Sequence, residues 1–311
     1  MLKPLRYVLE GVLASLAFVT VPLLPRRAVL SLARGLGDAA FRLAGPLRRI
    51  ALANLDTAFG DSVDAARKRD VARGAFRMYA RFFLDLFWFS FRGEARVRQC
   101  FRFDPSFDAH WRTKPAVVVT CHLGNWEMLG QVLAARGEPA LSVAAPVRNP
   151  FVNWMLRSSR RAAARPIVEK HRMVRRLVRA LRAGDRVALL LDQNTVPRVG
   201  GTFTPFFGLP VPVSKAAAAL AARTDAPIVF VYCVAEEGGV YRAHALPPLT
   251  AAEAGERYGG VTEAVTRFIE DAVRAHPGEW GWMYKRWKYI PRGYPRKGYP
   301  FYALEIEDGN L

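Results

Sequence analysis

The sequence has little cysteine and little histidine, and each shortage excludes a class of protein. Its 311 residues contain only three cysteines, Cys100, Cys121 and Cys233, which form no CxxC motif and cannot all pair. This argues against a disulfide-stapled secreted domain and against a cysteine-rich zinc site. The five histidines lack the spacing of metal ligands. We therefore expect a protein of a reducing compartment, without a bound metal.

Acidic residues are also scarce, since 27 Asp and Glu stand against 46 Lys and Arg and give a formal charge of +19. Lysine is rare as well: 38 of the 46 basic residues are arginine. A guanidinium group can donate two parallel hydrogen bonds to one phosphate. The charge therefore predicts a polyanionic partner, which could be nucleic acid, an anionic membrane or a phosphorylated substrate. At 51% hydrophobic residues the chain is too apolar to be disordered.

The N-terminus carries an uncharged run, Gly11–Leu24, between basic residues. As a helix its fourteen residues would cover about 21 Å, less than the roughly 30 Å of a bilayer core. Glu10 and the lack of a small-x-small cleavage site fit a secretory signal poorly. A buried core helix and a cleaved signal stay open as alternatives. The favoured prediction is that residues 1–25 form a hydrophobic membrane anchor, embedded in the membrane or lying at its surface.

Residues 26–110 are predicted to form the helical N-terminal part of the domain. Ser62 could cap a long helix whose apolar residues recur at three- or four-residue spacing. Its second half is rich in aromatic residues: Phe82, Phe83, Phe87, Trp88, Phe89 and Phe91. An aromatic stripe of this kind more often packs in the core than lies on the surface. A lipid-facing surface remains the alternative, because one helix seldom buries so many rings.

From residue 111 to 311 short apolar runs alternate with helical segments. The predicted strands are 116–120, 141–145, 187–192, 227–235 and 241–246, and the predicted helices are 125–136, 149–164, 170–183, 213–224 and 256–275. This alternation is typical of an α/β domain with a largely parallel sheet flanked by helices. No repeat or linker divides it, so we expect one domain with a helical extension.

Candidate catalytic residues follow the first of these strands. In a parallel sheet, ligands bind at the carboxyl ends of the strands. The predicted strand 116–120 is followed by the segment His122-Leu123-Gly124-Asn125-Trp126-Glu127. Asn125 can cap the next helix, and Gly124 lets the turn bend far enough for Glu127 to approach the imidazole. A carboxylate on one ring nitrogen leaves the other as a general base. A purely structural His122 is the alternative, and Cys121 is expected to be a buried residue rather than a nucleophile.

The His122–Glu127 segment resembles the H-x-x-x-x-(D/E) block of the lysophospholipid acyltransferase superfamily. Its Gly-Asn-Trp-Glu form is similar to that of the lipid A biosynthesis late acyltransferases, the lauroyl and myristoyl transferases of the bacterial envelope. Three later segments resemble further blocks of this family in order and spacing: Arg148-Asn149-Pro150 with Trp154 and Arg160, Leu191-Asp192-Gln193 with residues 200–208, and Pro277–Lys288 with its tryptophans.

The resemblance implies a glycerolipid acyltransferase-like fold and acyl transfer from a thioester to a hydroxyl of a lipid A precursor. The donor would be acyl carrier protein or acyl-coenzyme A as co-substrate, with no other cofactor. His122 would be the base oriented by Glu127, while substrate would contact Asn125, Arg148, Arg160, Asp192 and Gln193. The enzyme would lie on the cytoplasmic membrane with its catalytic domain facing the cytoplasm. A phosphatidylinositol mannoside or an aminolipid is an alternative acceptor.

Two basic segments fit these partners. Residues 142–186 carry eleven Arg and one Lys against two acids, and residues 284–297 carry six basic residues and no acid. The helix bearing Arg175 to Arg182 is either a solvated face or a docking face for an acidic carrier protein. Near the C-terminus, Trp280, Trp282 and Trp287 alternate with cations, which could indicate stacking on single-stranded nucleic acid or membrane-interface anchoring. The apolar N-terminus favours the membrane, and a basic nucleic-acid-binding protein is the competing class.

Overall fold

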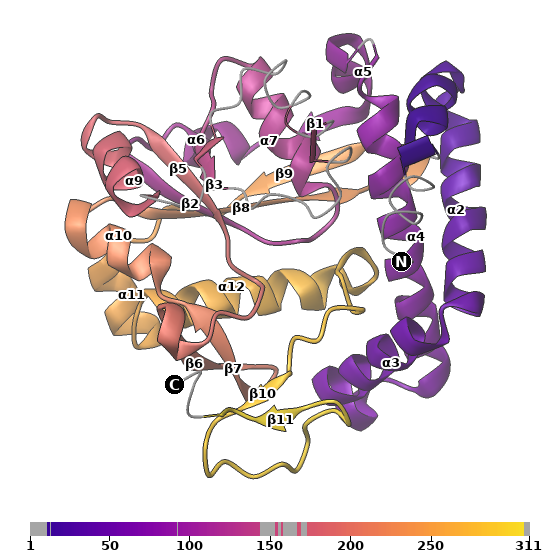
Figure 1. The fold of residues 1–311 in the computed structure, drawn as a ribbon. Helices are drawn as coiled ribbons and strands as arrows, with labels where there is room; N and C mark the ends of the chain where they lie inside the picture. Colours follow the sequence, from indigo (N-terminus) through magenta and orange to yellow (C-terminus); the bar gives the residue numbers. More distant parts are fainter. Residues whose placement is uncertain are drawn as a thin grey trace.

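A seven-stranded sheet forms the middle of the molecule (Figure 1). The computed structural model describes residues 11–12, 14–91, 93–143, 153–154, 157, 167–168 and 173–307. The strands in spatial order are β1 (Phe101–Phe103), β9 (Tyr241–Ala245), β8 (Ile228–Ala235), β2 (Ala116–Thr120), β5 (Arg186–Leu190), β3 (Leu141–Val143) and β4 (Ile167–Val168). Neighbours pair in parallel except β8 and β9. Those two are antiparallel because only a short turn joins them. The predicted largely parallel sheet is confirmed.

Helices cover both faces of this sheet, as a parallel sheet requires. In Figure 1, α6 and α7 lie above it and α10, α11 and α12 below it. The helices of the α/β part are α5 (Gly93–Cys100), α6 (Phe107–Trp111), α7 (Trp126–Ala135), α9 (Met173–Arg182), α10 (Ala216–Thr224), α11 (Ala251–Tyr258) and α12 (Val261–Ala275). The predicted helix 256–275 is thus two helices, broken at Gly259 and Gly260, whose positive φ angles end α11.

The N-terminal helices stand beside the sheet, at the right of Figure 1. They are α2 (Arg26–Leu43), α3 (Gly45–Phe59) and α4 (Ala65–Trp88), with the short η1 (Val21–Leu23) and η2 (Gly60–Ser62). The predicted Ser62 cap is wrong: the side chain of Asp64 accepts from the Arg67 amide and caps α4. The aromatic stripe is mostly core, with Phe82 and Trp88 buried, but Phe83 and Phe91 are about half exposed.

The side chains of β2 alternate between the two halves of the core. Val117 and Val119 pack in the cluster that includes α9, α10 and α12, whereas Ala116 and Val118 pack in the cluster of α6 and α7. All five residues of the strand are buried. A run of β-branched residues covered on both faces explains why the sequence predicted this strand residue for residue.

The C-terminal part closes the lower half of the core and corrects one prediction. The hairpin of β6 (Gly201–Phe206) and β7 (Leu209–Ser214) replaces the first residues of the predicted helix 213–224, and β10 (Tyr289–Ile290) pairs with β11 (Leu304–Glu305). Trp280, Trp282 and Trp287 are at most 1% exposed and belong to the core. Their predicted place at a membrane interface is therefore wrong, because rings inside the core cannot reach lipid.

The described part of the N-terminal apolar run exposes several large side chains, although Val21 and Pro22 at its end are buried. Val12, Leu16 and Val19 are each about 60% exposed, so these side chains do not form a buried core helix. Among the residues that the structure describes, no helix is both long and apolar enough to cross a membrane. The predicted anchor at residues 1–25 remains a prediction.

Candidate active site

His122 and Asp192 come together where two neighbouring parallel strands end. Strands β2 and β5 are in register at Thr120 and Leu190, and each candidate residue lies two positions beyond that pair. The Leu191 amide donates to the Thr120 carbonyl at 3.2 Å and keeps the two segments side by side past the last ladder pair. Strand register thus places this imidazole beside this carboxylate.

Asp192 accepts three hydrogen bonds. Its Oδ1 lies 2.7 Å from His122 Nδ1, and its Oδ2 accepts from the His122 backbone amide and from Trp280 Nε1, both at 3.0 Å. The carboxylate is 3% exposed. A buried charge is stable only with such partners, so the three donors hold the carboxylate in place and ionised.

The pair is electrostatically coupled. Burial disfavours the charged form of Asp192, but the adjacent His122 and its hydrogen bonds outweigh burial and lower the pKa of Asp192 to about 2. Burial also disfavours the imidazolium, yet the charge and hydrogen bond of Asp192 raise the pKa of His122 above 6.5. Since Asp192 is ionised at neutral pH, Nδ1 carries the proton and the neutral ring presents Nε2 as a base. The His122 side chain is 21% exposed.

The turn after His122 requires glycine. Gly124 has a φ of +59°, and a Cβ there would stand 2.0 Å from the carbonyl oxygen of Cys233 in β8. Its amide donates to the Glu279 carbonyl at 2.8 Å, in η5 (Pro277–Glu279). The turn is therefore held between β8 and η5, which fixes the position of His122 beyond the end of β2.

Asn125 and Glu127 begin α7 as predicted. The Asn125 side chain accepts from the Met128 amide at 3.1 Å and its Nδ2 lies 3.4 Å from Asp85 Oδ2. Asn125 is fully buried, so its side chain serves as a cap inside the protein. Glu127 is 3% exposed in the first turn, where the helix dipole favours its ionised form. The carboxylate that the structure places on His122 Nδ1 is Asp192, although the sequence analysis assigned that role to Glu127.

Cys121, the residue before His122, is part of the core. It is 0% exposed in the cluster with Val117 and Val119, and burial raises the pKa of its thiol well above 9. A thiol in this state is a poor nucleophile, because the thiolate is the reactive form.

An aromatic wall borders His122. The imidazole meets the Trp126 ring edge-on at a centroid distance of 4.7 Å, and Trp126 stacks on Phe82 of α4 at 4.2 Å. Tyr79 completes the wall at 6.2 Å from Trp126. Behind Trp126 a small cavity of about 30 Å³ lies between α7 and the sheet, and Trp111 is also part of its lining. Among the described residues, aromatic rings therefore cover one side of the imidazole.

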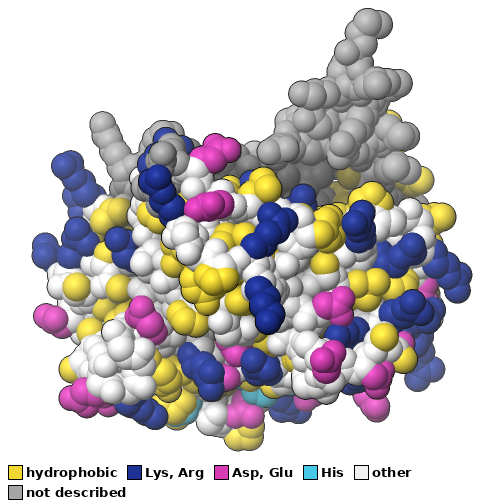
Figure 2. All heavy atoms as spheres, turned by 90° about the horizontal axis from the view of Figure 1, so that it is seen from below, with side chains coloured by type: hydrophobic (Ala, Val, Ile, Leu, Met, Phe, Trp, Pro, Cys, Tyr) yellow, Lys and Arg dark blue, Asp and Glu magenta, His cyan; other side chains and the backbone are white. Residues whose placement is uncertain are grey.

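The structure places only some of the predicted substrate residues. Arg148 and Arg160 lie outside the described residues. Gln193 is exposed next to the buried Asp192. On α9, the exposed arginines are Arg175, Arg176, Arg179 and Arg182, whereas Leu177 and Leu181 face the core. Figure 2 shows Lys and Arg spread over the face seen from below and mixed with acidic and apolar side chains.

No group of three His, Cys, Asp or Glu that could hold a metal ion occurs within the described residues. His122, held on Nδ1, can take a proton at Nε2 and return it.

Two features of the site were missed by the sequence analysis. Trp280 orients Asp192, but its alternation with cations suggested the membrane instead. Asp85 of α4 is fully buried and binds Arg26 of α2, the Tyr241 hydroxyl at 2.5 Å and Asn125. An acidic residue in the aromatic second half of α4 was the available signal, since a buried carboxylate needs partners.

Comparison with known proteins gives the site its context. The model of the bacterial lipid A biosynthesis acyltransferase family matches residues 2–289, nearly the whole chain. The chain is also 22% identical over 280 residues to the lipid A biosynthesis lauroyltransferase of Escherichia coli (strain K12), covering 88% of this chain and 90% of that protein. With a family match of this extent around an imidazole and carboxylate at the strand ends, the chain belongs to the bacterial lipid A biosynthesis acyltransferases and is an acyltransferase.

Proposed function

We propose that this acyltransferase moves a fatty acyl chain from a carrier thioester to a hydroxyl of a lipid A precursor, with His122 as the general base. The observation that carries the proposal is the 2.7 Å contact between His122 Nδ1 and the ionised Asp192, which leaves Nε2 as the basic atom. An alcohol with a pKa far above 7 needs such a base at the moment of attack.

The reaction then proceeds in two steps. The acceptor oxygen attacks the thioester carbonyl carbon while its proton passes to His122 Nε2. The tetrahedral intermediate collapses with cleavage of the carbon–sulfur bond, and the imidazolium returns the proton to the leaving thiolate. Asp192 orients the ring and stabilises the imidazolium, and Glu127 adds negative charge from the first turn of α7. Base catalysis of this kind contributes about 10²–10⁴ in rate.

The intermediate carries an oxyanion that needs positioned donors. Because the Asn125 side chain is engaged as a cap with the Met128 amide, we assign this role to the other backbone amides in the first turn of α7. Their positive dipole end favours the negative charge that develops there.

Charge and apolar surface support the choice of partners. An acidic acyl carrier protein and a phosphorylated glycolipid both suit a chain of +19, and the exposed arginines of α9 offer a docking face for the carrier. Arg148 and Arg160 are proposed to bind the acceptor. The exposed N-terminal apolar residues support a place on the cytoplasmic membrane, with the catalytic part on the cytoplasmic side.

The function is tested by mass spectrometry of envelope lipids from cells with and without the gene, followed by a purified assay. We expect lipid A species lacking one acyl chain in the deletion strain. We also expect restoration by the wild-type gene and none by His122→Ala at equal protein level. Unchanged lipid A together with a missing acyl group on a phosphatidylinositol mannoside or an aminolipid would move the proposal to that acceptor.

A further inference from the structure

A second cleft lies where the segment after β5 meets β10 and the residues before it. It has a volume of about 300 Å³, which is at the lower end of the range for small-ligand sites. Asn194, Val196 and Val199 line it from the first segment, and Tyr284, Lys285, Lys288 and Tyr289 line it from the second. We call it the lysine cleft. Neither His122 nor Asp192 is part of its lining.

The lysine cleft is tied to the catalytic carboxylate through both segments. Asn194 follows Asp192 by two residues, and Tyr284 follows by four residues Trp280, which donates to Asp192. The Asn194 backbone amide donates to the Tyr284 hydroxyl at 2.9 Å, and Asn194 Nδ2 donates to the Lys285 carbonyl at 3.0 Å. Because these bonds join the two segments, a group bound in the cleft has a fixed position relative to the base.

The side-chain groups of the lysine cleft that remain free are hydrogen-bond donors. Asn194 is engaged at both ends of its amide, since Nδ2 donates to a carbonyl and Oδ1 accepts from Arg286 at 3.0 Å. The Tyr284 hydroxyl accepts from the Asn194 amide and the Tyr289 hydroxyl accepts from Lys288 Nζ, both at 2.9 Å. Each hydroxyl therefore keeps its own proton to donate.

The lysine cleft also carries unpaired positive charge. Lys285 and Lys288 form no ion pair with any residue that the structure describes, and no Asp or Glu lines the cleft. Arg286, between them in sequence, is 1% exposed and has no carboxylate partner in the described part of the chain. Burial lowers the pKa of Arg286 to about 10, so it stays charged at neutral pH. A buried cation without an ion pair is costly, and an anion in the cleft would offset that cost.

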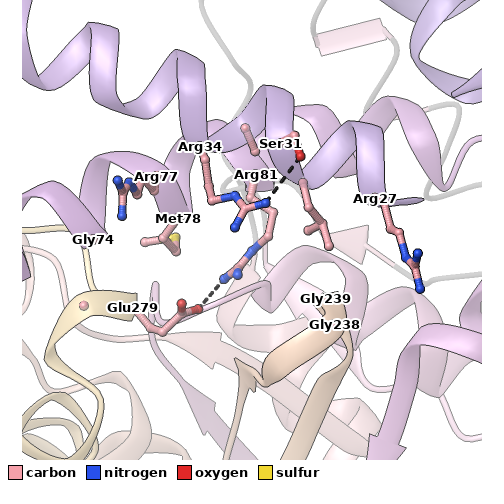
Figure 3. Close-up of a pocket in the computed structure, with 13 residues that line it drawn as sticks. Arg27, Ser31, Arg34, Gly74, Arg77, Met78, Arg81, Gly238, Gly239 and Glu279 are labelled. Carbon is pink, nitrogen blue, oxygen red and sulfur yellow. Dashed lines mark hydrogen bonds and ion pairs between the residues drawn. The ribbon is translucent and has the colours of Figure 1, made fainter. Parts of the chain in front are cut away.

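A larger basic cleft, between α2 and α4, differs in this respect. It has a volume of about 780 Å³, and Figure 3 shows Arg34, Arg77 and Arg81 beside it with Glu279 opposite. Arg81 and Glu279 form an ion pair at 2.6 Å, and Arg77 pairs with Asp38 at 2.7 Å. An anion there would compete with carboxylates for Arg77 and Arg81, whereas it meets no such competitor in the lining of the lysine cleft.

We propose that the lysine cleft binds a phosphate group of the glycolipid acceptor, with Lys285 and Lys288 as charged donors and the hydroxyls of Tyr284 and Tyr289 as neutral donors. This assignment rests on the proposed function, which supplies a phosphorylated acceptor. An ionised phosphate presents acceptor oxygens, so it matches a cleft whose free side-chain groups donate. Bound next to the loop of Asp192, the phosphate would position the acceptor hydroxyl and select phosphorylated acceptors.

The test is steady-state kinetics of the purified full-length enzyme with two acceptors, the phosphorylated glycolipid and the same glycolipid after phosphatase treatment. Lys285→Met/Lys288→Met is the cleft variant. Methionine keeps an apolar stem and removes the charge, and no ion pair of the described residues is broken. Lys114→Met/Lys215→Met is the matched control, because it removes the same charge from two exposed positions outside the cleft.

We expect the KM for the phosphorylated acceptor to rise about tenfold or more in the cleft variant, since a hydrogen bond to a charged group contributes at least about that factor. The kcat and the KM for the thioester donor should stay close to those of the wild type. The phosphatase-treated acceptor should give the same KM with both proteins, because the group that the lysines bind is gone. The control variant should behave like the wild type with both acceptors.

The donor also carries phosphate when it is acyl carrier protein or acyl-coenzyme A, and the same kinetics distinguish the two sources. A raised KM for the donor with an unchanged KM for the acceptor would assign the cleft to the donor and overturn the acceptor assignment. Unchanged KM values in the cleft variant, or an equal rise in the control variant, would overturn the site itself.

Binding to inactive protein separates this proposal from the proposed function. In isothermal titration, His122→Ala should bind the phosphorylated acceptor like the wild type, and adding Lys285→Met/Lys288→Met should weaken binding about tenfold. Continued acyl transfer by His122→Ala would contradict the assigned base and leave this binding result intact. Equal affinity of His122→Ala for the phosphorylated and the phosphatase-treated acceptor would overturn the lysine cleft as a phosphate site.

Discussion

Asp192 decides the protonation state of the His122 imidazole, because its carboxylate lies with one oxygen 2.7 Å from Nδ1 and is itself held by Trp280 and a backbone amide. The charge of this one residue raises the pKa of His122 against the effect of burial. Its influence can therefore be measured as a shift in the pH dependence of the rate, which a purely structural residue would not produce.

The acidic limb of the rate profile gives the first prediction. The reaction needs a neutral imidazole, so the wild-type rate should rise with pH through an apparent pKa above 6.5. Asp192→Asn removes the charge and leaves burial, which lowers the pKa of His122, so the limb should move to lower pH. The plateau kcat should fall about 10²-fold because the ring loses its fixed tautomer.

Glu127→Gln is the comparison for that profile. We expect a smaller loss of kcat and a smaller shift, since the structure places Asp192 on Nδ1. A larger effect of Glu127→Gln than of Asp192→Asn on both quantities would return the orienting role to Glu127.

At the scale of the elements, one buried ion pair ties the N-terminal helices to the site. Asp85 of α4 joins Arg26 of α2, Tyr241 of β9 and the cap residue Asn125. Removing one partner of such a pair leaves the other charged and buried, which costs more than the loss of an exposed pair.

Asp85→Asn should therefore lower the free energy of unfolding by about 3 kcal/mol. Asp56→Asn is the control, because Asp56 is 66% exposed in its pair with Lys68 and should cost less than about 1 kcal/mol. Denaturant unfolding of both variants measures the difference. Similar losses would mean that the Asp85 cluster does not stabilise the junction of the helices and the sheet.

Arg160 is proposed to bind the acceptor, whereas Arg179 is a surface residue. Arg179 is exposed on α9, so Arg179→Ala should leave the acceptor KM unchanged and at most weaken docking of the carrier protein. Arg160→Ala should raise the acceptor KM severalfold or abolish transfer. Steady-state kinetics with each substrate varied in turn checks this, and equal effects on the acceptor KM would contradict the division.

Local patterns were sufficient for part of the fold and of the site. The strand Ala116–Thr120 and the cap at Asn125 depend on neighbouring residues only, and both are confirmed. The pairing of Asp192 with His122 depends on strand order, because β5 lies beside β2 although β3 and β4 separate them in sequence. Burial of Trp280 likewise depends on what packs over it, which the alternation with basic residues does not show.

At the scale of the whole molecule, apolar and basic groups share the exposed surface of the N-terminal helices. Val12, Leu16 and Val19 precede α2, which exposes both leucines and arginines. The two segments together suit a membrane surface better than either does alone.

Removal of residues 1–25 should therefore release much of the protein from the cytoplasmic membrane or make it aggregate. Fractionation of cells that express the full-length and shortened chains measures this, with the outer membrane as a reference fraction. Full-length, unprocessed protein that stays in the supernatant without detergent would contradict the predicted anchor.

The central claim is direct attack assisted by His122, and one comparison of two neighbouring residues tests it most directly. His122→Ala and Cys121→Ser are assayed as purified proteins with a thioester donor, while the intact mass of the wild type is followed during turnover. The account predicts a loss of at least about 10³ in kcat for His122→Ala, nearly unchanged kcat for Cys121→Ser and no acylated enzyme. An inactive Cys121→Ser variant, with an acyl adduct accumulating on the wild type, would contradict direct attack and require a covalent intermediate.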